Sequence, residues 1–121
     1  MNEKRNVLRD KTFLFAIEII KNHKILVEKK EFVMSKQLLR SGTAIGALVR
    51  QAGNAESRAD FIHKLGIDQK ECDETIYWLE LLKEVNYITE KEFNSLSQQG
   101  IELLKIIRSS ILTAKGKIKN S

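Results

Sequence analysis

Two glutamates, Glu71 and Glu74, lie about one helical turn apart in an otherwise apolar stripe of a predicted helix. Carboxylates that project into a helical bundle hold di-iron centres when Glu-x-x-His motifs accompany them. The chain contains no Glu-x-x-His motif: His63 precedes Glu71 by eight residues, and His23 lies on a different predicted helix. A ferritin-like metalloprotein is therefore the weakest interpretation of these acids, and we expect no metal and no cofactor.

Arg50 is the partner that we expect for the two carboxylates. It lies among small residues of the preceding predicted helix, and a guanidinium forms bidentate, charge-assisted pairs with carboxylates. Arg50, Glu71 and Glu74 are therefore predicted to form a structural polar network, within one chain or between chains. Removing one member of a buried pair costs about 3 to 5 kcal/mol, so Arg50→Ala is predicted to lower the thermal midpoint by many degrees.

Nucleophilic catalysis finds no support in the residue pattern. Ser41, Ser57 and Cys72 have no histidine at a spacing that indicates a catalytic pair, and the chain has no glycine-rich phosphate loop. Cys72, the single cysteine, falls on an apolar helical position, which favours core packing over a reactive thiol. We predict a protein without enzymatic activity and without a small-molecule substrate.

The elements that must position these side chains are predicted to be helices. Proline is absent and glycine occurs six times, whereas 42% of the residues are apolar, so a folded chain with few turns is expected. Apolar periodicity predicts helices over residues 7–30, 35–54, 58–85 and 89–114, followed by a basic C-terminal tail. With short connections, residues 1–121 are predicted to form one all-α domain, an antiparallel up-down-up-down four-helix bundle.

Local patterns refine two of these helices. Ser35 is the predicted N-cap of the second helix, and Thr89 with Glu92 forms a capping-box pattern at the start of the fourth. Gly42 and Gly46 lie within the second helix, where each costs roughly 1 kcal/mol relative to alanine. We interpret both as positions of close helix packing rather than as parts of a ligand pocket.

The first predicted helix is apolar on more than one side. One set of apolar residues contains Phe13, Ile17, Ile20 and Val27, and a second set contains Phe15, Ile19 and Leu26. A helix in a monomeric bundle needs one buried stripe, so the additional surface indicates a second neighbour, for example another subunit. A well-enclosed helix is the alternative.

Charge is distributed unevenly along the chain. Residues 1–64 carry 13 basic and 7 acidic side chains, residues 65–104 carry 3 and 9, and residues 105–121 carry 5 and none. A polyanion would bind the basic parts. The candidate nucleic-acid-binding residues are Lys4, Arg5, Arg9, Lys11, Lys115, Lys117 and Lys119. Without a helix-turn-helix, zinc-finger or aromatic-rich signature, binding to RNA or DNA would be weak and directed at the backbone; a solvated charged surface is the alternative.

The chain shows no signal for export or membrane insertion. Its longest nearly apolar run, residues 13–20, contains Glu18 and is too short to span a bilayer. The charged N-terminus MNEKRNVLRDK lacks the features of a secretory signal. A cytoplasmic protein without a membrane partner is expected.

Four stretches carry a family resemblance: Gln37, Leu38 and Arg40; RSGTAIGALVRQA from Arg40 to Ala52; AESRADFIHKLGI from Ala55 to Ile67; and KECDETIYWLELL from Lys70 to Leu82. By these motifs, which cover about half the chain, the sequence resembles the four-helix-bundle family of 23S ribosomal RNA intervening-sequence proteins. The resemblance implies a small bacterial bundle of poorly defined role. A similar class, the accessory proteins of diversity-generating retroelements, forms five-membered rings with a basic surface that binds nucleic acid, so a homo-pentamer is expected.

Three positions depart from the common family pattern. Leu48 replaces a frequent asparagine, Gln51 a frequent glutamate and Asp68 a frequent alanine. The resemblance thus implies a smaller polar network around Arg50 than in other members. Two interpretations of function remain: a non-enzymatic oligomeric module that binds RNA or DNA, and a protein-interaction or structural bundle without nucleic-acid binding.

Overall fold

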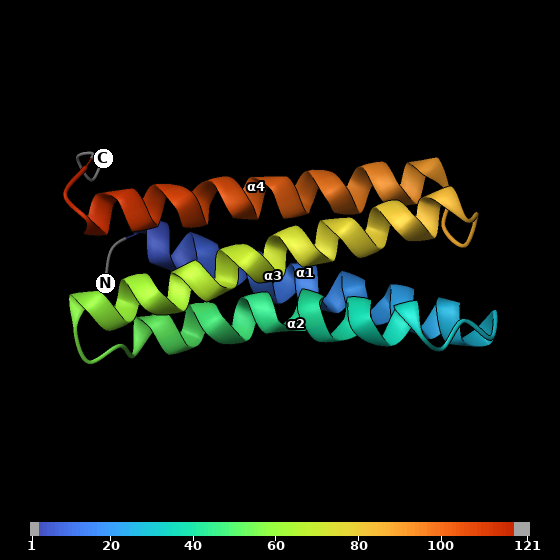
Figure 1. The fold of residues 1–121 in the computed structure, drawn as a ribbon, viewed down its shortest axis with the longest axis horizontal. Coiled ribbons are helices and arrows are strands. Elements are labelled where there is room, and N and C mark those ends of the chain that lie inside the picture. Colours follow the sequence, from blue (N-terminus) through green and yellow to red (C-terminus); the bar gives the residue numbers. More distant parts are fainter. Residues whose placement is uncertain (1–2, 118–121) are drawn as a thin grey trace.

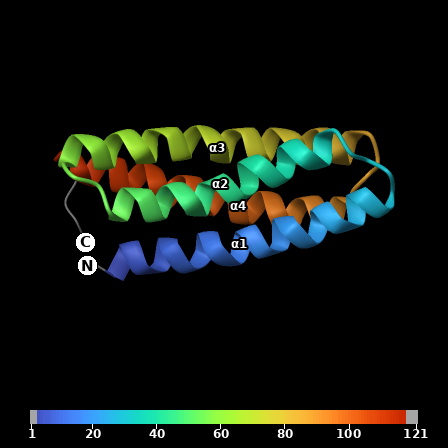
Figure 2. The ribbon, with the colours of Figure 1, turned by 90° about the horizontal axis from the view of Figure 1, so that it is seen from below.

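The computed structural model describes residues 3–117, with side chains described from residue 7 onward. Over this range the chain forms four helices: α1 (Glu3–Glu28), α2 (Met34–Gly53), α3 (Arg58–Glu84) and α4 (Glu90–Ala114). Consecutive helices pack side by side with alternating direction, and α1 also packs against α4 (Figure 1). Seen from below, α1 and α3 lie on opposite sides of the bundle (Figure 2). The predicted all-α antiparallel four-helix bundle is confirmed.

The starts of α2 and α4 are set by short-range hydrogen bonds. At α4 the Glu92 amide donates to the Thr89 hydroxyl and the Thr89 amide donates to the Glu92 carboxylate, which confirms the capping box. The predicted helix over residues 35–54 is present with a shift of one residue, but the predicted N-cap is wrong, because Ser35 lies inside the first turn of α2. The Ser35 amide donates instead to Glu31 Oε1 at 2.6 Å, so a carboxylate in the preceding loop satisfies this free amide.

The core is a single apolar layer shared by all four helices. Among the side chains buried in it are Leu8, Phe15, Ile19, Leu26, Leu38, Ile45, Leu65, Leu79, Leu82, Leu103 and Ile107. The second apolar set of α1 faces this core, whereas Phe13 from the first set is 53% exposed. The prediction that α1 is apolar on more than one side is confirmed.

None of the helices in the described part of the chain is long and apolar enough to cross a membrane.

Gly42 of α2 packs tightly against α1. A Cβ atom at Gly42 would lie 2.8 Å from Ile19 Cγ1, which is closer than two carbon atoms pack. At Gly46 the nearest atom would be Thr12 Oγ1 at 3.4 Å, an ordinary van der Waals contact. The close-packing prediction is therefore confirmed at Gly42, while alanine fits at Gly46.

Candidate functional site

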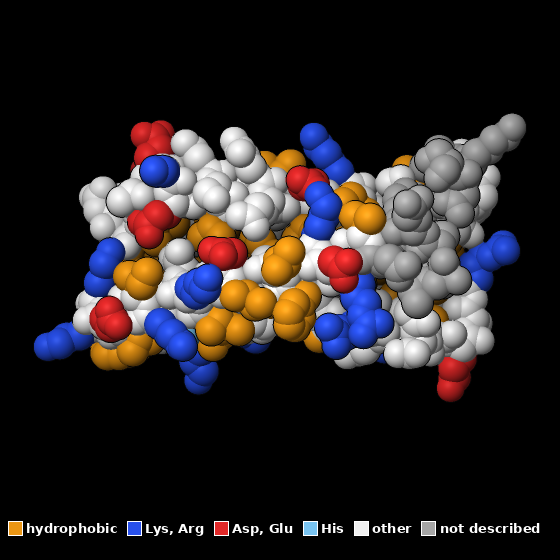
Figure 3. Space-filling model, turned by 180° about the vertical axis from the view of Figure 1, so that it is seen from behind, with side chains coloured by type: hydrophobic (Ala, Val, Ile, Leu, Met, Phe, Trp, Pro, Cys, Tyr) orange, Lys and Arg blue, Asp and Glu red, His pale blue; other side chains and the backbone are white. Residues whose placement is uncertain are grey.

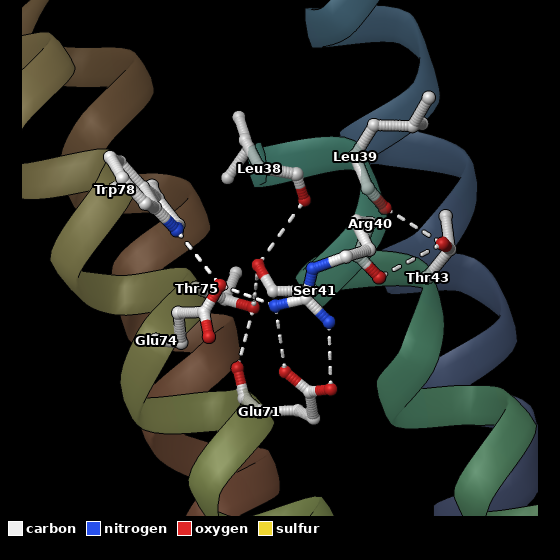
Figure 4. A network of polar contacts seen from close by, with 9 residues as sticks. All are labelled: Leu38, Leu39, Arg40, Ser41, Thr43, Glu71, Glu74, Thr75 and Trp78. Atoms are coloured by element: carbon white, nitrogen blue, oxygen red, sulfur yellow. Dashed lines mark hydrogen bonds and ion pairs between the residues drawn. The ribbon is translucent and has the colours of Figure 1, made fainter. Parts of the chain in front are cut away.

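Arg40 of α2 holds two carboxylates of α3 (Figure 4). Its Nη1 donates to Glu71 Oε2 at 2.9 Å and its Nη2 to Glu71 Oε1 at 3.2 Å, which is a bidentate pair. Nη2 also donates to Glu74 Oε2, and Trp78 Nε1 donates to the same oxygen at 3.0 Å. The hydrogen bond from Trp78, together with that from Arg40, lowers the pKa of Glu74. We call this cluster of Arg40, Glu71, Glu74 and Trp78 the Arg40 clamp.

A buried hydroxyl pair lies directly beside the Arg40 clamp. The Thr75 hydroxyl donates to the Glu71 carbonyl oxygen at 2.7 Å and lies 2.9 Å from the Ser41 hydroxyl of α2. Both side chains are completely buried. Because buried hydroxyls are costly without partners, this contact favours one register of α2 against α3. The clamp and the hydroxyl pair thus form one polar crossing between the two helices.

The predicted pairing of Arg50 with Glu71 and Glu74 is wrong within the chain. The Arg50 side chain is exposed, and its guanidinium carbon lies 5.6 Å from the centre of the Phe13 ring on α1. The physical reason is the antiparallel register. Arg40 and Glu71 are equally distant from the middle of the loop between α2 and α3, whereas Arg50 is level with the start of α3.

Arg40, and not Arg50, is therefore the arginine whose loss is expected to destabilise the protein. Arg40→Ala is expected to lower the free energy of unfolding by about 1 to 2 kcal/mol, because it removes charge-assisted hydrogen bonds that solvent partly screens. The Arg40 side chain is 48% exposed, which keeps this loss well below that of a buried pair. Arg50→Ala is expected to change the free energy of unfolding by less than about 1 kcal/mol. Urea unfolding of both variants measures the two losses, and equal losses would contradict the prediction that Arg40 contributes more than Arg50.

Asp68 of α3 is a polar core residue that the apolar pattern did not predict. Its side chain is 0% exposed, and neither carboxyl oxygen has a hydrogen-bond partner among the described residues. Burial, followed by the negative charge of Glu71, raises the pKa of Asp68 to about 8. The carboxyl is thus largely protonated at pH 7. Two features of the sequence pointed to the burial of Asp68. It lies about one turn from Leu65 and from Cys72 on the buried stripe of α3, and it replaces an alanine that is common in the family.

The buried thiol of Cys72 is one turn away from Asp68. Burial, with a smaller contribution from the charge of Asp68, raises the pKa of Cys72 above its ordinary range. A thiol that stays protonated and inaccessible is a poor nucleophile. Its position agrees with the expected packing role.

The predicted nucleic-acid-binding residues fall into three groups. Three are exposed at the end of the bundle where α1 begins and α4 ends: Arg9, Lys115 and Lys117. Lys11 forms an ion pair with Glu102 of α4, so its charge is already partnered. Three lie outside the described side chains: Lys4, Arg5 and Lys119.

Metal binding was the remaining chemical interpretation of the paired acids. Both Glu71 and Glu74 face Arg40, whose positive charge disfavours a cation at that place. Between residues 3 and 117, no group of three or more histidine, cysteine, aspartate or glutamate side chains is arranged to hold a metal ion. The acids therefore serve the contact between α2 and α3.

Comparisons with known proteins agree with this architecture. A crystal structure of a protein of unknown function from the S23 ribosomal protein family of Bacteroides thetaiotaomicron VPI-5482 superposes with a TM-score of 0.88. The two chains are 53% identical over 89% of this chain and 97% of the other. No curated protein sequence matches. The profile described as 23S rRNA-intervening sequence protein matches residues 4–109, and the chain therefore belongs to the 23S rRNA-intervening sequence protein family.

Proposed function

We propose that this protein is a self-associating helical bundle that binds the phosphate backbone of RNA or DNA at one end. The observation that supports this function is a group of cations at that end. The antiparallel topology places the starts of α1 and α3 beside the ends of α2 and α4, and cations from these helices therefore lie at the same end of the bundle. We call this part of the surface the basic end. Its exposed cations include Arg9, Arg50, Arg58, Arg108, Lys115 and Lys117.

The opposite end of the bundle provides a contrast. Its two loops and the adjoining helical turns mix both signs of charge, with Glu28, Lys29, Lys30, Glu84 and Glu90 among the exposed side chains. At the basic end the exposed cations outnumber the exposed acids, which include Asp10 and Glu56, and a polyanion is attracted by such a net positive charge but gains little from a neutral mixture. The proposed binding is thus oriented, with the basic end toward the nucleic acid.

Charge reversal at the basic end tests this function. Lys115→Glu with Lys117→Glu is expected to weaken binding of a labelled RNA hairpin or DNA duplex at low salt by about tenfold or more, because two phosphate contacts become repulsive. The logarithm of the wild-type affinity is expected to fall by roughly 0.7 to 0.9 units per phosphate contact for each tenfold rise in salt. Fluorescence anisotropy across a salt series measures both effects.

The matched control reverses two exposed lysines near the opposite end. Lys36→Glu with Lys91→Glu makes the same change in net charge and is expected to leave most of the affinity in place. If both variants lose the same affinity for the nucleic acid, the net charge of the protein explains the loss and the position of the lysines does not. Absence of wild-type binding at low salt would refute the nucleic-acid function and favour a bundle that interacts only with proteins.

Self-association is supported by the outer surface of α1. Figure 3, which views the molecule from the α1 side, shows hydrophobic side chains gathered along the middle of this face beside a group of lysines and arginines. Its exposed members include Phe13, Leu14, Ile20, Ile25 and Val27. Contiguous exposed apolar surface of this kind marks interfaces. A homo-pentamer remains the proposed assembly, on the resemblance to the retroelement accessory proteins.

Leu14→Glu is expected to dissociate the assembly, because it places a charge within the apolar contact. Light scattering coupled to gel filtration gives the mass of each variant. Tyr77→Glu on α3 is the matched control, since Leu14 is 60% exposed and Tyr77 53%. A wild-type monomer, or dissociation by the Tyr77 variant instead, would contradict the proposed interface.

A further inference from the structure

A cavity of about 330 Å³ opens at the basic end, where all four helices meet. The apolar part of its lining includes the buried side chains of Leu8, Val49, Ala52 and Leu65 and the half-buried ring of Phe61. Ligand pockets begin at about this volume. The cavity therefore fits one compact group of the size of a nucleobase with its sugar, and not a helix or an extended acyl chain.

Two arginines stand beside these apolar walls. Arg9 and Arg50 both line the cavity and are exposed, and neither forms an ion pair in the part of the chain that the structure describes. The Arg50 guanidinium lies over the Phe13 ring, which limits its freedom and keeps it near the opening. A planar guanidinium group can donate two parallel hydrogen bonds to two oxygens of one phosphate or carboxylate. The geometry suits a ligand whose apolar body carries an anionic group.

Two polar side chains in the lining narrow the chemistry further. Asn54 Nδ2 donates to the Arg50 carbonyl oxygen at 3.1 Å, which leaves Oδ1 as an acceptor. The Ser110 hydroxyl donates to the Ile106 carbonyl oxygen at 2.9 Å, which leaves lone pairs on its oxygen. A ligand that uses these acceptors must carry N–H or O–H donors. A nucleotide carries both, on its amino-bearing base and on its sugar, whereas an ionised fatty acid carries neither.

We propose that this cavity binds one unstacked nucleotide, with its base against the apolar walls and its phosphate at Arg9 and Arg50. Two ligands present an amino-bearing base joined to a phosphate: a free mononucleotide, and one unpaired nucleotide of a single-stranded RNA or DNA. For the single-stranded ligand, the inference rests on the proposed function. The cavity then adds recognition of an unpaired nucleotide to contacts with the backbone.

Calorimetry with adenosine 5′-monophosphate, ribose 5-phosphate and inorganic phosphate tests the site directly. The nucleotide is expected to bind at least about tenfold more tightly than either base-free phosphate, because only it fills the apolar cavity. Ala52→Met, which fills the cavity, and Arg50→Gln, which removes a charge from its rim, are each expected to weaken nucleotide binding by about tenfold. Lys36→Gln, at the far end of the bundle, is the control for lost charge.

Anisotropy with a labelled single-stranded oligonucleotide and a labelled duplex distinguishes the two sources. Ala52→Met is expected to weaken single-strand binding and to leave duplex binding within about twofold, since a duplex offers no unpaired base. Loss for the mononucleotide alone would assign the site to free nucleotides. Circular dichroism establishes that Ala52→Met folds, and if it does not, Arg50→Gln carries the test.

Equal affinity for all three phosphates, or nucleotide binding that neither variant changes, would overturn the proposed site. Duplex binding by the wild-type protein would persist in that case, so the proposed function would survive. Conversely, mononucleotide binding without any binding of the RNA hairpin, the duplex or the single strand would refute the proposed function and leave the cavity site standing.

Discussion

Replacing Asp68 with alanine is expected to stabilise the protein, and the gain is expected to grow as the pH rises. The wild-type carboxyl is completely buried and without a hydrogen-bond partner among the described residues, so its ionised form is strongly disfavoured in the folded state. Alanine removes the ionisable group at the cost of a small cavity of about 1 kcal/mol. The net gain at pH 7 is expected to be about 2 to 3 kcal/mol.

The direction with pH follows from the two pKa values. The unfolded chain releases the Asp68 proton near its ordinary pKa of 3.8, whereas the folded protein holds it up to about 8. Between these values the unfolded state binds fewer protons, so the wild-type stability contributed by this group falls as the pH rises and levels off above about 8. Urea unfolding of wild type and Asp68→Ala at pH 5, 7 and 9 measures the difference.

Asp73→Ala is the matched control for this prediction. Asp73 lies on the same helix and carries the same side chain, but it is exposed to solvent. The Asp73 variant is expected to follow the wild-type stability profile across the pH range within about 0.5 kcal/mol. Parallel profiles for wild type and Asp68→Ala would show instead that Asp68 ionises freely in the folded protein.

Gly42→Val is expected to destabilise the protein by about 3 kcal/mol, with Gly42→Ala intermediate. The first added carbon would lie 2.8 Å and 2.9 Å from the two γ-carbons of Ile19. Ile19 is fully buried and branched at Cβ, so it cannot rotate away cheaply. The resulting strain exceeds the roughly 1 kcal/mol that a residue other than glycine gains in helix propensity. Thermal unfolding followed by circular dichroism measures the loss.

A second glycine and a second substitution isolate the cause. Gly66 lies inside α3, two turns from its start, and a Cβ there would meet no atom within 4 Å, so Gly66→Ala is expected to stabilise the protein by about 0.5 to 1 kcal/mol. Ile19→Ala alone opens a core cavity and is expected to cost about 2 to 5 kcal/mol, but Gly42→Ala is expected to cost less in the Ile19→Ala background than in the wild-type protein, because the clashing γ-carbons are gone. Destabilisation by both glycine variants alike would contradict the contact with Ile19.

The prediction of four helices succeeded because its signals are local. The capping box of Thr89 and Glu92, the apolar repeats and the absence of proline each depend on residues within a turn or two. Short loops then leave an antiparallel bundle as the simplest arrangement. Even the start of α2, where Glu31 replaces Ser35 as the capping group, differs from the prediction by a single residue.

Local patterns do not show which arginine of α2 pairs with Glu71, because the pairing depends on the distance of each residue from the loop between α2 and α3. Arg40 and Arg50 both precede Glu71 on a helix of small residues, and residue type does not separate them. Counting outward from the middle of the loop between α2 and α3 places Arg40 opposite Glu71, which is the pairing observed. That signal was present in the sequence, but it becomes useful only when the loop and the helix register are taken together.

Packing between distant segments decided the features that remain. Phe13 and Phe15 are two residues apart and equally apolar, yet Phe15 is in the core and Phe13 is exposed beside Arg50. Asp68 is completely buried without a hydrogen-bond partner among the described residues, and Gly42 differs from Gly66 through one neighbour on α1. Helix formation follows from nearby residues and is readable along the chain. Burial, clashes and the cavity at the basic end depend on ångström-scale distances between helices, which no local pattern encodes.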